Sequence, residues 1–488
     1  MATEISDWND LDNVRNDLTG DYVLVNDLDS DTDGYGGIGD DFEPIGGGGN
    51  GFTGQLDGGS FEIKDLVIDK PNETFVGLFG QLGTATSVGG SVFDLTVAAD
   101  VTGAGESFDE GTGVLAGTAR GDTQLTNVTV KGQVSQPNGD FGAGGLVGIA
   151  REEDTELKIE NCISHVDVIA GSSGRVGGIV GYFFDDSGGL VITESYATGS
   201  VEGDERVGGL VGQNEDTIET SYVTASVEGN DQVGGLVGRN EATITESYAT
   251  GSVEGNDEVG GLAGRSGSGS LIDKTYSLGN VTGSDEVGGL YGAGFTVDVS
   301  ESYAVGNVAG DTNVGGFAGN SGDGNRERNY FNTESTTQSD AFGTSDGGGG
   351  VTGLTTTEMQ GSEAETNMDG FDFANVWATV EGDAETINGQ ITLDDVAAET
   401  ATVILHNFSE PEGIDSLVDG YPILLSVDEG EQLESQNAVV KNISRTETDT
   451  DGNYSAEIPG AAGDTIAVGV DFDDGTERYG RLVTTVLE

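Results

Sequence analysis

The chain contains few of the residue types on which disulfide-bonded proteins, zinc proteins and many enzymes depend. Its 488 residues include one cysteine, two histidines and six prolines. Cys162 allows no internal disulfide, and His165 and His406 lie too far apart in the sequence to favour a zinc site or a Ser-His-Asp triad. No apolar run approaches the roughly 18 residues that a membrane-spanning helix needs. We therefore expect no membrane insertion.

Basic residues are also scarce. The chain has 18 Lys and Arg against 87 Asp and Glu, which gives a formal net charge of −69. Such a chain repels the phosphates of nucleic acids and the anionic lipids of membranes, so both are excluded as partners. A fold with this charge repels itself in dilute buffer, whereas salt at about 1 M screens charges beyond roughly 3 Å. We expect a protein of an extreme halophile, an archaeon or its virus, that needs high salt.

Glycine is abundant, at 85 residues, and much of it belongs to an internal repeat. A Gly-Gly-apolar-apolar-Gly phrase recurs along the chain, with degenerate copies near the N-terminus. Its central apolar residues are Leu78, Leu115, Leu146, Ile179, Leu210, Leu236, Leu262, Leu290 and Phe317. Their spacing shortens from 37 residues to 26–28 residues. The glycine pair predicts a corner at which the backbone turns sharply or takes a positive φ.

Two further phrases keep step with the first. One is Ile-x-x-x-Tyr, as in Ile192 and Tyr196, and we expect Cys162 in the Tyr position one coil earlier, as a small core residue. The other is Gly-x-Val-x-Gly, as in residues 199–203. Three short β-rich phrases in about 26 residues leave no room for an ordinary helix, so we predict three strands per turn. A unit this small buries its apolar face only against its neighbours, which places like residues above like.

These phrases resemble the GLUG-motif repeat family of β-solenoids, found in haloarchaeal and bacterial surface proteins including large adhesins. Residues 8–18 and Phe42-Glu43-Pro44-Ile45-Gly46 resemble the opening of such solenoids, and residues 329–334 resemble their closing module. The resemblance covers about residues 5–380, with Ser60-Phe61 where the family usually has Gly-His. It implies a fold, but no particular biochemical function.

Both ends of the chain differ from the repeat. Trp8, Leu11, Val14 and Leu18 form one helical stripe after Ser6 or Asp7 as N-cap, which predicts a helix that covers the open end of the solenoid. After residue 385 the repeat stops, and short alternating segments separated by turns such as Asp451-Gly452 predict a β-sandwich. Residues 448–454 resemble the carboxypeptidase regulatory-like (prealbumin-like) sandwich, which is not catalytic itself.

We therefore predict an all-β fold: a right-handed parallel β-helix (β-solenoid) with a short N-terminal capping helix and a C-terminal β-sandwich domain. Residues 1–50 form the N-terminal cap in this prediction, and residues 51–322 form the GLUG-type solenoid. Residues 323–384 form the closing module or C-terminal cap, and residues 385–488 form the Ig-like or prealbumin-like sandwich.

The search for chemistry yields two aligned columns and one loop. Gln213, Arg239 and Arg265 align from coil to coil and are the candidates for a polysaccharide-cleaving site. Glu246, Lys274 and Glu301 also align, and their alternating sign indicates a cross-strand charge ladder. The loop is Asp29-x-Asp31-x-Asp33-Gly34 with Asp40 at the twelfth position, a pattern of hard oxygen ligands that suits Ca²⁺, with an acidic hairpin tip as the alternative. We predict no catalytic site and no organic cofactor.

Three functions compete. The first is a non-catalytic structural or adhesive virion protein of a haloarchaeal virus, such as a tail fibre, spike or capsid turret, at the virion surface. It would be a homo-oligomer, trimeric or pentameric, with other virion proteins and a host surface glycoprotein or glycan as partners. The N-terminus has no secretory signal pattern, which favours this hypothesis. The alternatives are a cell-surface adhesin of a haloarchaeon and a polysaccharide-active β-helix enzyme.

Overall fold

The computed structural model describes residues 2–85, 88–105, 110–139, 141–151, 157–171, 174–184, 190–344, 349–373 and 376–378, followed by separate segments between residues 388 and 486. The chain divides into two compact units, residues 1–353 and residues 354–488. The division falls inside the segment predicted as the closing module. Each unit is described by itself below.

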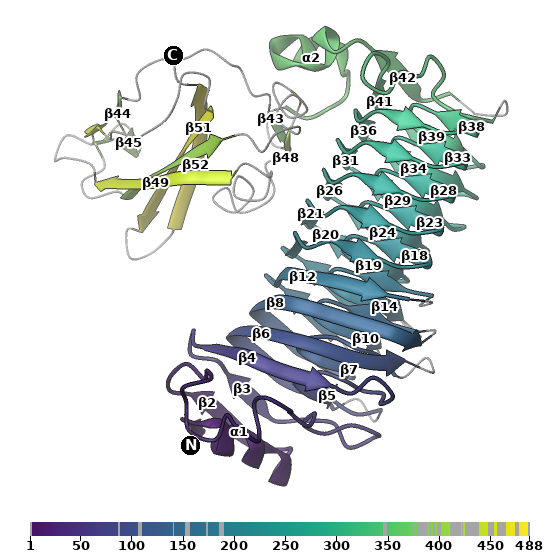
Figure 1. The fold of residues 1–488 in the computed structure, drawn as a ribbon. Helices are drawn as coiled ribbons and strands as arrows, with labels where there is room; N and C mark the ends of the chain where they lie inside the picture. The colour runs from purple at the N-terminus through teal and green to yellow at the C-terminus, as the bar shows by residue number, and fades with distance from the viewer. Residues whose placement is uncertain are drawn as a thin grey trace. The chain divides into compact units, whose positions relative to one another are not determined.

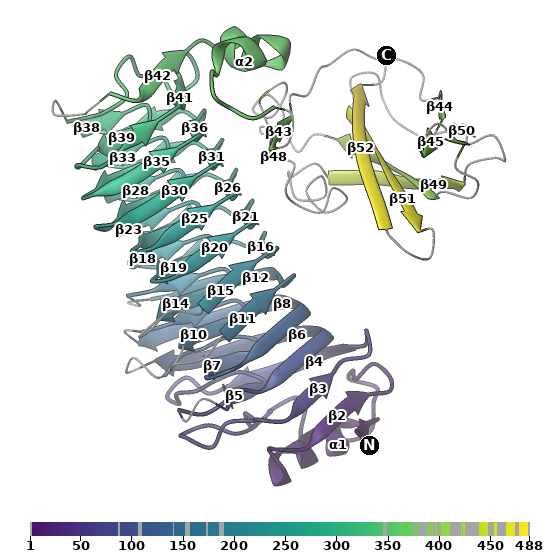
Figure 2. The same cartoon turned by 180° about the vertical axis from the view of Figure 1, so that it is seen from behind.

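The first unit is a parallel β-helix, which confirms the predicted fold class (Figure 1, Figure 2). Its strands form three sheets along the solenoid, here called sheets 1, 2 and 3, of which sheet 3 begins at Ala143. Within the described residues, sheet 2 contains nine strands and sheet 3 contains seven. Sheet 2 consists of β5 (Phe79–Leu82), β7 (Ala116–Arg120), β10 (Val147–Arg151), β14 (Val180–Phe184), β19 (Val211–Asn214), β24 (Val237–Asn240), β29 (Ala263–Ser266), β34 (Tyr291–Gly294) and β39 (Ala318–Asn320). Sheet 3 consists of β9 (Ala143–Gly144), β13 (Val176–Gly177), β18 (Glu205–Gly208), β23 (Asp231–Gly234), β28 (Asp257–Gly260), β33 (Asp285–Gly288) and β38 (Thr312–Gly315).

Sheet 1 is the broad side of the solenoid. Its N-terminal strands are β1 (Thr3–Ile5), β2 (Asp21–Leu24), β3 (Gln55–Asp57), β4 (Glu62–Asp69), β6 (Ser91–Gly105), β8 (Gln124–Gly139), β11 (Leu157–Glu160) and β12 (Ile163–Ala170). The later strands are β15 (Leu190–Thr193), β16 (Tyr196–Ala197), β17 (Val201–Glu202), β20 (Thr217–Glu219), β21 (Tyr222–Val223), β22 (Val227–Glu228), β25 (Thr243–Thr245), β26 (Tyr248–Ala249), β27 (Val253–Glu254), β30 (Ser270–Asp273), β31 (Tyr276–Ser277), β32 (Val281–Thr282), β35 (Val297–Ser300), β36 (Tyr303–Ala304), β37 (Val308–Ala309), β40 (Arg326–Glu327), β41 (Asn329–Asn332) and β42 (Val351–Leu354).

A regular coil of the described stretch 190–344 contains five short strands rather than the predicted three. The coil from β20 to β24 shows the pattern: β20, β21 and β22 lie in sheet 1, β23 in sheet 3 and β24 in sheet 2. The break between β20 and β21 lies at Thr220, which has a φ of 51°. In the N-terminal coils the same side is spanned by longer strands, such as β6 and β8. The coil therefore still has three sides, and the bends divide only the broad one.

Identical positions of successive coils lie in register, as the repeat predicts. Ile192 pairs with Ile218, and Ile218 with Ile244. The Tyr positions form a buried stack in which neighbouring ring centroids are 4.6–5.2 Å apart and the ring planes are within 12° of parallel. The stacked rings are Tyr196, Tyr222, Tyr248, Tyr276 and Tyr303. Such contacts are worth about 0.5–1.5 kcal/mol beyond their burial, so the stack adds stability to the coils between Tyr196 and Tyr303.

Cys162 does not occupy the Tyr position, and that prediction is wrong. Ile163 pairs with Tyr196, so Cys162 aligns with Ser195 instead, and its backbone N–H donates to the Ser195 Oγ over 3.0 Å. The same contact recurs in later coils, where the N–H of Ser195 donates to Ser221 and that of Ser221 to Ser247. Cys162 is nonetheless fully buried, as expected of a core residue, and burial raises the pKa of its thiol to about 12.

The repeated glycine pair lies at a corner, as predicted, because the chain bends at Gly209 and Leu210 between β18 of sheet 3 and β19 of sheet 2. None of the described Gly-Gly-apolar-apolar-Gly positions has a positive φ. The left-handed conformation is taken instead by non-glycine residues at two places in each coil. One set is Glu194, Thr220, Glu246, Lys274 and Glu301, and the other is Arg206, Gln232, Glu258, Glu286 and Asn313. The glycines are needed because sheets 2 and 3 approach closely, as described below.

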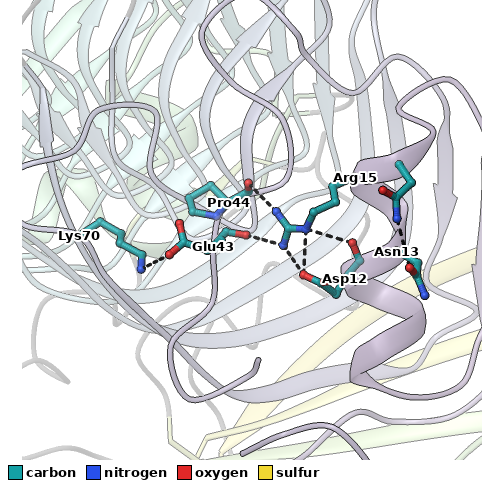
Figure 3. A network of polar contacts seen from close by, with 7 residues as sticks. Asp12, Asn13, Arg15, Glu43, Pro44 and Lys70 are labelled. Atoms are coloured by element: carbon teal, nitrogen blue, oxygen red, sulfur yellow. Dashed lines mark hydrogen bonds and ion pairs between the residues drawn. The ribbon is translucent and has the colours of Figure 1, made fainter. Parts of the chain in front are cut away.

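The N-terminal end is covered by α1 (Trp8–Asn13) and the 3-10 helix η1 (Val14–Asn16), which confirms the predicted capping helix in a shorter form. Asp7 is the N-cap, because its side chain accepts from the Asp10 N–H over 2.9 Å. Arg15 fastens the helix to residues 43–44: its guanidinium binds the Asp12 carboxylate and donates to the carbonyls of Glu43 and Pro44 (Figure 3). Lys70 holds the other side of this segment through Glu43 at 2.6 Å (Figure 3).

The second unit contains η2 (Thr357–Met359), α2 (Gly361–Asn367) and antiparallel strands. In its described segments β49 (Val439–Glu447), β47 (Thr402–Ser409), β51 (Thr465–Asp473) and β52 (Arg478–Val486) form one sheet in that order. Short pairs are β43 (Trp377–Ala378) with β48 (Ile423–Leu424), β44 (Asn388–Gln390) with β50 (Asn453–Ser455), and β45 (Thr392–Leu393) with β46 (Val396–Ala397). The predicted strands are present, whereas the sandwich itself stays a prediction. Its predicted turn at residues 451–452 lies outside the described residues. No helix among the described residues has the length and hydrophobicity to cross a membrane.

Candidate functional site

Sheets 2 and 3 lie beside each other along the solenoid (Figure 1), and polar side chains on and next to their strands contact one another from coil to coil. This set of residues is here called the seam. The seam includes Arg175, Tyr182, Arg206, Gln213, Glu215, Gln232, Arg239, Glu241, Glu258, Arg265, Glu286 and Asn320. Four of its members are arginines in a chain that has nearly five acidic residues for each basic one. The same set contains four glutamates, so its charges balance, unlike those of the chain as a whole.

Glycine brings the two sheets together. A Cβ on Gly208 of β18 would lie 2.1 Å from the Val211 oxygen and 2.5 Å from the Gly238 nitrogen. A Cβ on Gly238 of β24 would lie 2.4 Å from the Arg206 carbonyl carbon and 2.6 Å from the Gly212 oxygen. These are backbone atoms that cannot move aside, so only glycine fits. The close approach also brings side chains of neighbouring coils within hydrogen-bonding distance of one another.

The N-terminal part of the seam is a connected network. Arg175, next to β13, donates from Nε to the Gln213 Oε1 over 2.9 Å and lies 4.3 Å from the Tyr182 ring centroid. The Tyr182 hydroxyl donates to the Glu215 carboxylate over 3.0 Å, and the Gln213 amide donates to the same oxygen over 2.5 Å. Arg206 donates to the Gly174 carbonyl over 3.4 Å. One carboxylate therefore organises residues from β14 and β19.

The C-terminal part consists of separate ion pairs. Arg239 pairs with Glu241, and Arg265 pairs with Glu258 of the adjacent strand over 2.7 Å. The Arg265 guanidinium also lies 4.5 Å from the ring centroid of Phe295, whose side chain is 51% exposed. Asn320 donates to Glu286 over 2.8 Å. Glu258 is only 9% exposed, and Arg265 pairs with its carboxylate.

Burial dominates the electrostatics of the seam. It raises the pKa of Glu215, although Tyr182 and Gln213 donate to that carboxylate and act in the opposite direction. Burial likewise raises the pKa of Glu258 against the effect of its partner Arg265. The pKa of Tyr182 is raised by burial and then by the charge of Glu215. Buried acids with raised pKa values occur at binding sites as well as at catalytic ones.

The predicted column of Gln213, Arg239 and Arg265 is confirmed, because Gln213 pairs with Arg239 and Arg239 with Arg265 in the register of sheet 2. The sequence argument missed the residues that complete the seam from sheet 3 and from the preceding coil: Arg175, Tyr182, Arg206, Gln232 and Glu258. A signal was present for three of them. Arg206, Gln232 and Glu258 each stand directly before a Val-Gly-Gly phrase, and so share one position of the repeat.

The second predicted column behaves as a charge ladder. Thr245 pairs with Asp273 and Asp273 with Ser300, so the next residues, Glu246, Lys274 and Glu301, follow one another along the solenoid. The pKa of Lys274 is raised first by its hydrogen bond to Asp273 and also by the charges of Glu301 and Glu246. The ion pairs themselves join Lys274 to Asp273 and Glu301 to Arg328, so attraction along the column is a secondary contribution.

The proposed calcium ligands lie in the loop between β2 and β3. Asp29 accepts from the Thr32 hydroxyl over 2.9 Å and from the Asp31 N–H over 3.0 Å, and the Thr32 hydrogen bond is the largest cause of its lowered pKa. Asp40 accepts from the Gly37 N–H over 2.7 Å. The described residues contain no group of three or more His, Cys, Asp or Glu side chains arranged to hold a metal ion, and Asp33 is not brought into such a group. Calcium binding at Asp29, Asp31, Asp33 and Asp40 stays a prediction.

Several acidic residues of successive coils form rows. Glu202 pairs with Glu228, and Glu228 with Glu254, on exposed positions of sheet 1. A second row in sheet 3 joins Asp231, Asp257 and Asp285. Like charges directly opposite one another on neighbouring strands are destabilising. The solenoid therefore stacks like charges, and salt should weaken their repulsion.

Comparisons with known proteins agree with the repeat. Residues 203–228 and 229–254 match the model of the GLUG motif, and both matches lie in the most regular coils. Over 231 residues, or 41% of this chain, the sequence is 30% identical to halomucin of Haloquadratum walsbyi (strain DSM 16790 / HBSQ001). The chain spans 2% of the length of halomucin. The findings support a GLUG-repeat protein of haloarchaeal type.

A solved structure from Bacteroides ovatus, provisionally named as an immunoglobulin A1 protease, has 22% sequence identity and a TM-score of 0.37. The match covers 62% of this chain and 75% of that one. A likeness at this level has no bearing on the function of the present chain.

Proposed function

We propose that the chain is a non-catalytic, surface-exposed or extracellular module of a haloarchaeon, in which a rigid polyanionic β-helix presents the seam to its surroundings. The similarity to halomucin carries this proposal. It is supported by the GLUG repeats and by the in-register acidic rows, which suit a brine. The comparisons favour this adhesin-like role over the virion protein, which stays a prediction together with its trimeric or pentameric assembly.

A binding role suits the seam better than a hydrolytic one. Glycoside hydrolysis requires one carboxyl group as acid and a second as base or nucleophile on either side of the bond. In the seam each carboxylate is held by its own partner: Glu215 by Tyr182, Glu241 by Arg239 and Glu258 by Arg265. We expect no release of reducing ends from acidic or neutral polysaccharides, measured in high salt. Turnover that Glu215→Gln or Glu258→Gln abolishes would establish an enzyme instead.

Labelling of intact cells tests the location. A membrane-impermeant amine reagent should modify Lys64 and Lys131, whose side chains are 37% and 46% exposed, in intact haloarchaeal cells that express the chain. A cytoplasmic protein labelled only after lysis serves as control. If the lysines react only after lysis, the surface proposal fails. Recovery of the chain in purified virus particles, and not in the cell envelope, would support the virion prediction.

A further inference from the structure

One coil departs from the repeat at two positions at once, on an exposed part of sheet 1. The three preceding coils carry Ser-Val-Glu there, at residues 200–202, 226–228 and 252–254. Residues 280–282 read Asn-Val-Thr instead. The strands of these coils pair in register, with Thr282 opposite Glu254. The two changes together replace one member of an acidic row by an Asn-x-Thr sequence (a sequon), the acceptor pattern for N-linked glycans.

The structure leaves the acceptor nitrogen of this sequon accessible. Asn280 lies in the connection between β31 and β32, and both Asn280 and Thr282 are exposed. The Asn280 Oδ1 accepts from the Asn307 N–H over 2.9 Å, which holds the oxygen side of the amide against the next coil. Its Nδ2 has no hydrogen-bond partner among the described residues. The nitrogen to which a sugar is joined is therefore free at the surface.

A second sequon of the first unit, Asn72-Glu73-Thr74, lies in the connection between β4 and β5. Asn72 is exposed in a turn that the Glu73 N–H closes by donating to the Lys70 carbonyl over 2.9 Å. Within the described part of the chain, the Asn72 side chain makes no hydrogen bond. Asparagines that carry glycans lie in surface loops of this kind, so Asn72 meets the same conditions as Asn280.

A third sequon, Asn127-Val128-Thr129, is held differently although Asn127 is exposed. The Asn127 Nδ2 donates to the Asp94 carboxylate over 2.8 Å, and its Oδ1 accepts from the Asn161 amide over 2.8 Å. Both ends of the amide thus belong to a hydrogen-bonded row across three coils. A transferase must take the amide out of this row, with the loss of both hydrogen bonds, before a sugar can be joined.

We propose that Asn280 and Asn72 are N-glycosylated on the folded chain and that Asn127 is not. The donor is an oligosaccharide joined to a lipid through phosphate. The Asn Nδ2 attacks C1 of the first sugar: the C1–N bond forms, the C1–O bond to phosphate breaks, the lipid phosphate leaves with the electron pair, and an amide proton passes to a base of the transferase. The inference rests on the proposed surface location. Three more sequons lie in strands of the second unit and are not part of the proposal: Asn407, Asn442 and Asn453.

Tryptic mass spectrometry of the full chain, purified from haloarchaeal cells that express it, tests the proposal. Trypsin cleaves after Lys and Arg but not before Pro, so the three sequons fall in separate peptides, residues 65–120, 121–131 and 275–326. We expect a glycan mass on the first and third peptides and none on the second. Absence of the glycan from peptide 65–120 or 275–326, or its presence on peptide 121–131, overturns the proposal.

Variants of the repeat locate the modification at Asn280. Thr282→Glu keeps Asn280 but restores the residue of the three preceding coils, and it should remove the glycan from peptide 275–326 while peptide 65–120 stays modified. Thr282→Ser keeps the sequon and is the matched control, which should retain the glycan. The double variant Ser252→Asn and Glu254→Thr copies the sequon one coil earlier and should add a glycan to it. A glycan that persists in Thr282→Glu overturns the assignment.

The location of the chain is read separately. Labelling of Lys64 and Lys131 on intact cells reports exposure at the surface whether or not a sugar is present. If both lysines are labelled and the peptides of Asn72 and Asn280 are unmodified, the glycosylation inference fails and the surface proposal stands. If the lysines react only after lysis and these peptides are unmodified, both fail.

Discussion

Gly238→Ala tests the close contact between sheets 2 and 3 from which the seam is built. The added Cβ would lie 2.4 Å from the Arg206 carbonyl carbon and 2.6 Å from the Gly212 oxygen. Carbon atoms in favourable contact are about 3.5–4.0 Å apart, so the sheets must separate locally by about 1 Å. Overpacking of this kind costs about 1–3 kcal/mol, and we expect the free energy of unfolding to fall by at least that range.

Urea unfolding followed by circular dichroism, in KCl at about 1 M, measures the effect. Gly36→Ala is the matched control, because a Cβ there meets no atom within 4 Å and the residue has no left-handed φ. Surface changes of this kind fall within about 0.5 kcal/mol of the unmodified protein. If Gly238→Ala is as stable as Gly36→Ala, the sheets are not in glycine-limited contact and the described seam is incorrect.

Further outcomes concern the tyrosine stack and the buried acids. Tyr248→Leu removes stacking with Tyr222 and Tyr276 and should lower the free energy of unfolding by about 1–3 kcal/mol. Tyr248→Phe keeps the ring and should therefore retain most of that stability. An equal loss of stability in both variants would rule out ring stacking as the cause. Burial raises the pKa of Glu215 and Glu258 above 4.5, so the folded chain binds protons that the unfolded chain releases. Their contribution to stability therefore increases as pH falls from about 7 towards 5. Glu215→Gln should reduce this increase, which urea titrations repeated across the pH range would measure. A pH profile that Glu215→Gln leaves unchanged would contradict burial of Glu215 as the cause.

The repeat carries enough information to predict the register. In a solenoid each apolar position is buried by the same position one coil away, so Ile192 and Ile218, or Tyr222 and Tyr248, meet whenever the spacing is constant. The same logic predicts the acidic rows and the Gln213, Arg239 and Arg265 column. It is less secure where the coil length changes, which is why Cys162 was assigned to the position that Ile163 occupies.

Local conformation was harder to predict than register. Glycine is the usual residue at positive φ, yet this chain places Arg206, Gln232 and Glu258 there and uses glycine for close approach instead. The residue types alone do not indicate that the positive φ values fall on non-glycine residues and that the glycines serve close contacts. It becomes visible only once the contact between β24 and the backbone of β18 in the preceding coil is known.

The seam could be predicted only in part for the same reason. The column of Gln213, Arg239 and Arg265 in sheet 2 belongs to one phrase of the repeat. The residues that contact this column belong to another phrase or to another coil. Arg175 reaches Gln213 across 38 residues, and Tyr182 reaches Glu215 across 33. Contacts of that length follow from the packing of the two sheets and not from the spacing within either phrase.

The salt dependence of the acidic rows tests the central claim, that acidic side chains of successive coils are stacked in register along the solenoid. Two carboxylates about 4.8 Å apart repel by at most about 0.9 kcal/mol in dilute buffer and about 0.2 kcal/mol at 1 M salt. With two such contacts, the triple variant Glu202→Gln, Glu228→Gln and Glu254→Gln should gain up to about 1.7 kcal/mol of unfolding free energy in dilute buffer. In urea titrations across a salt series, this gain should shrink to a few tenths of a kcal/mol at about 1 M KCl. A gain that is absent, or that does not change with salt, would contradict the account.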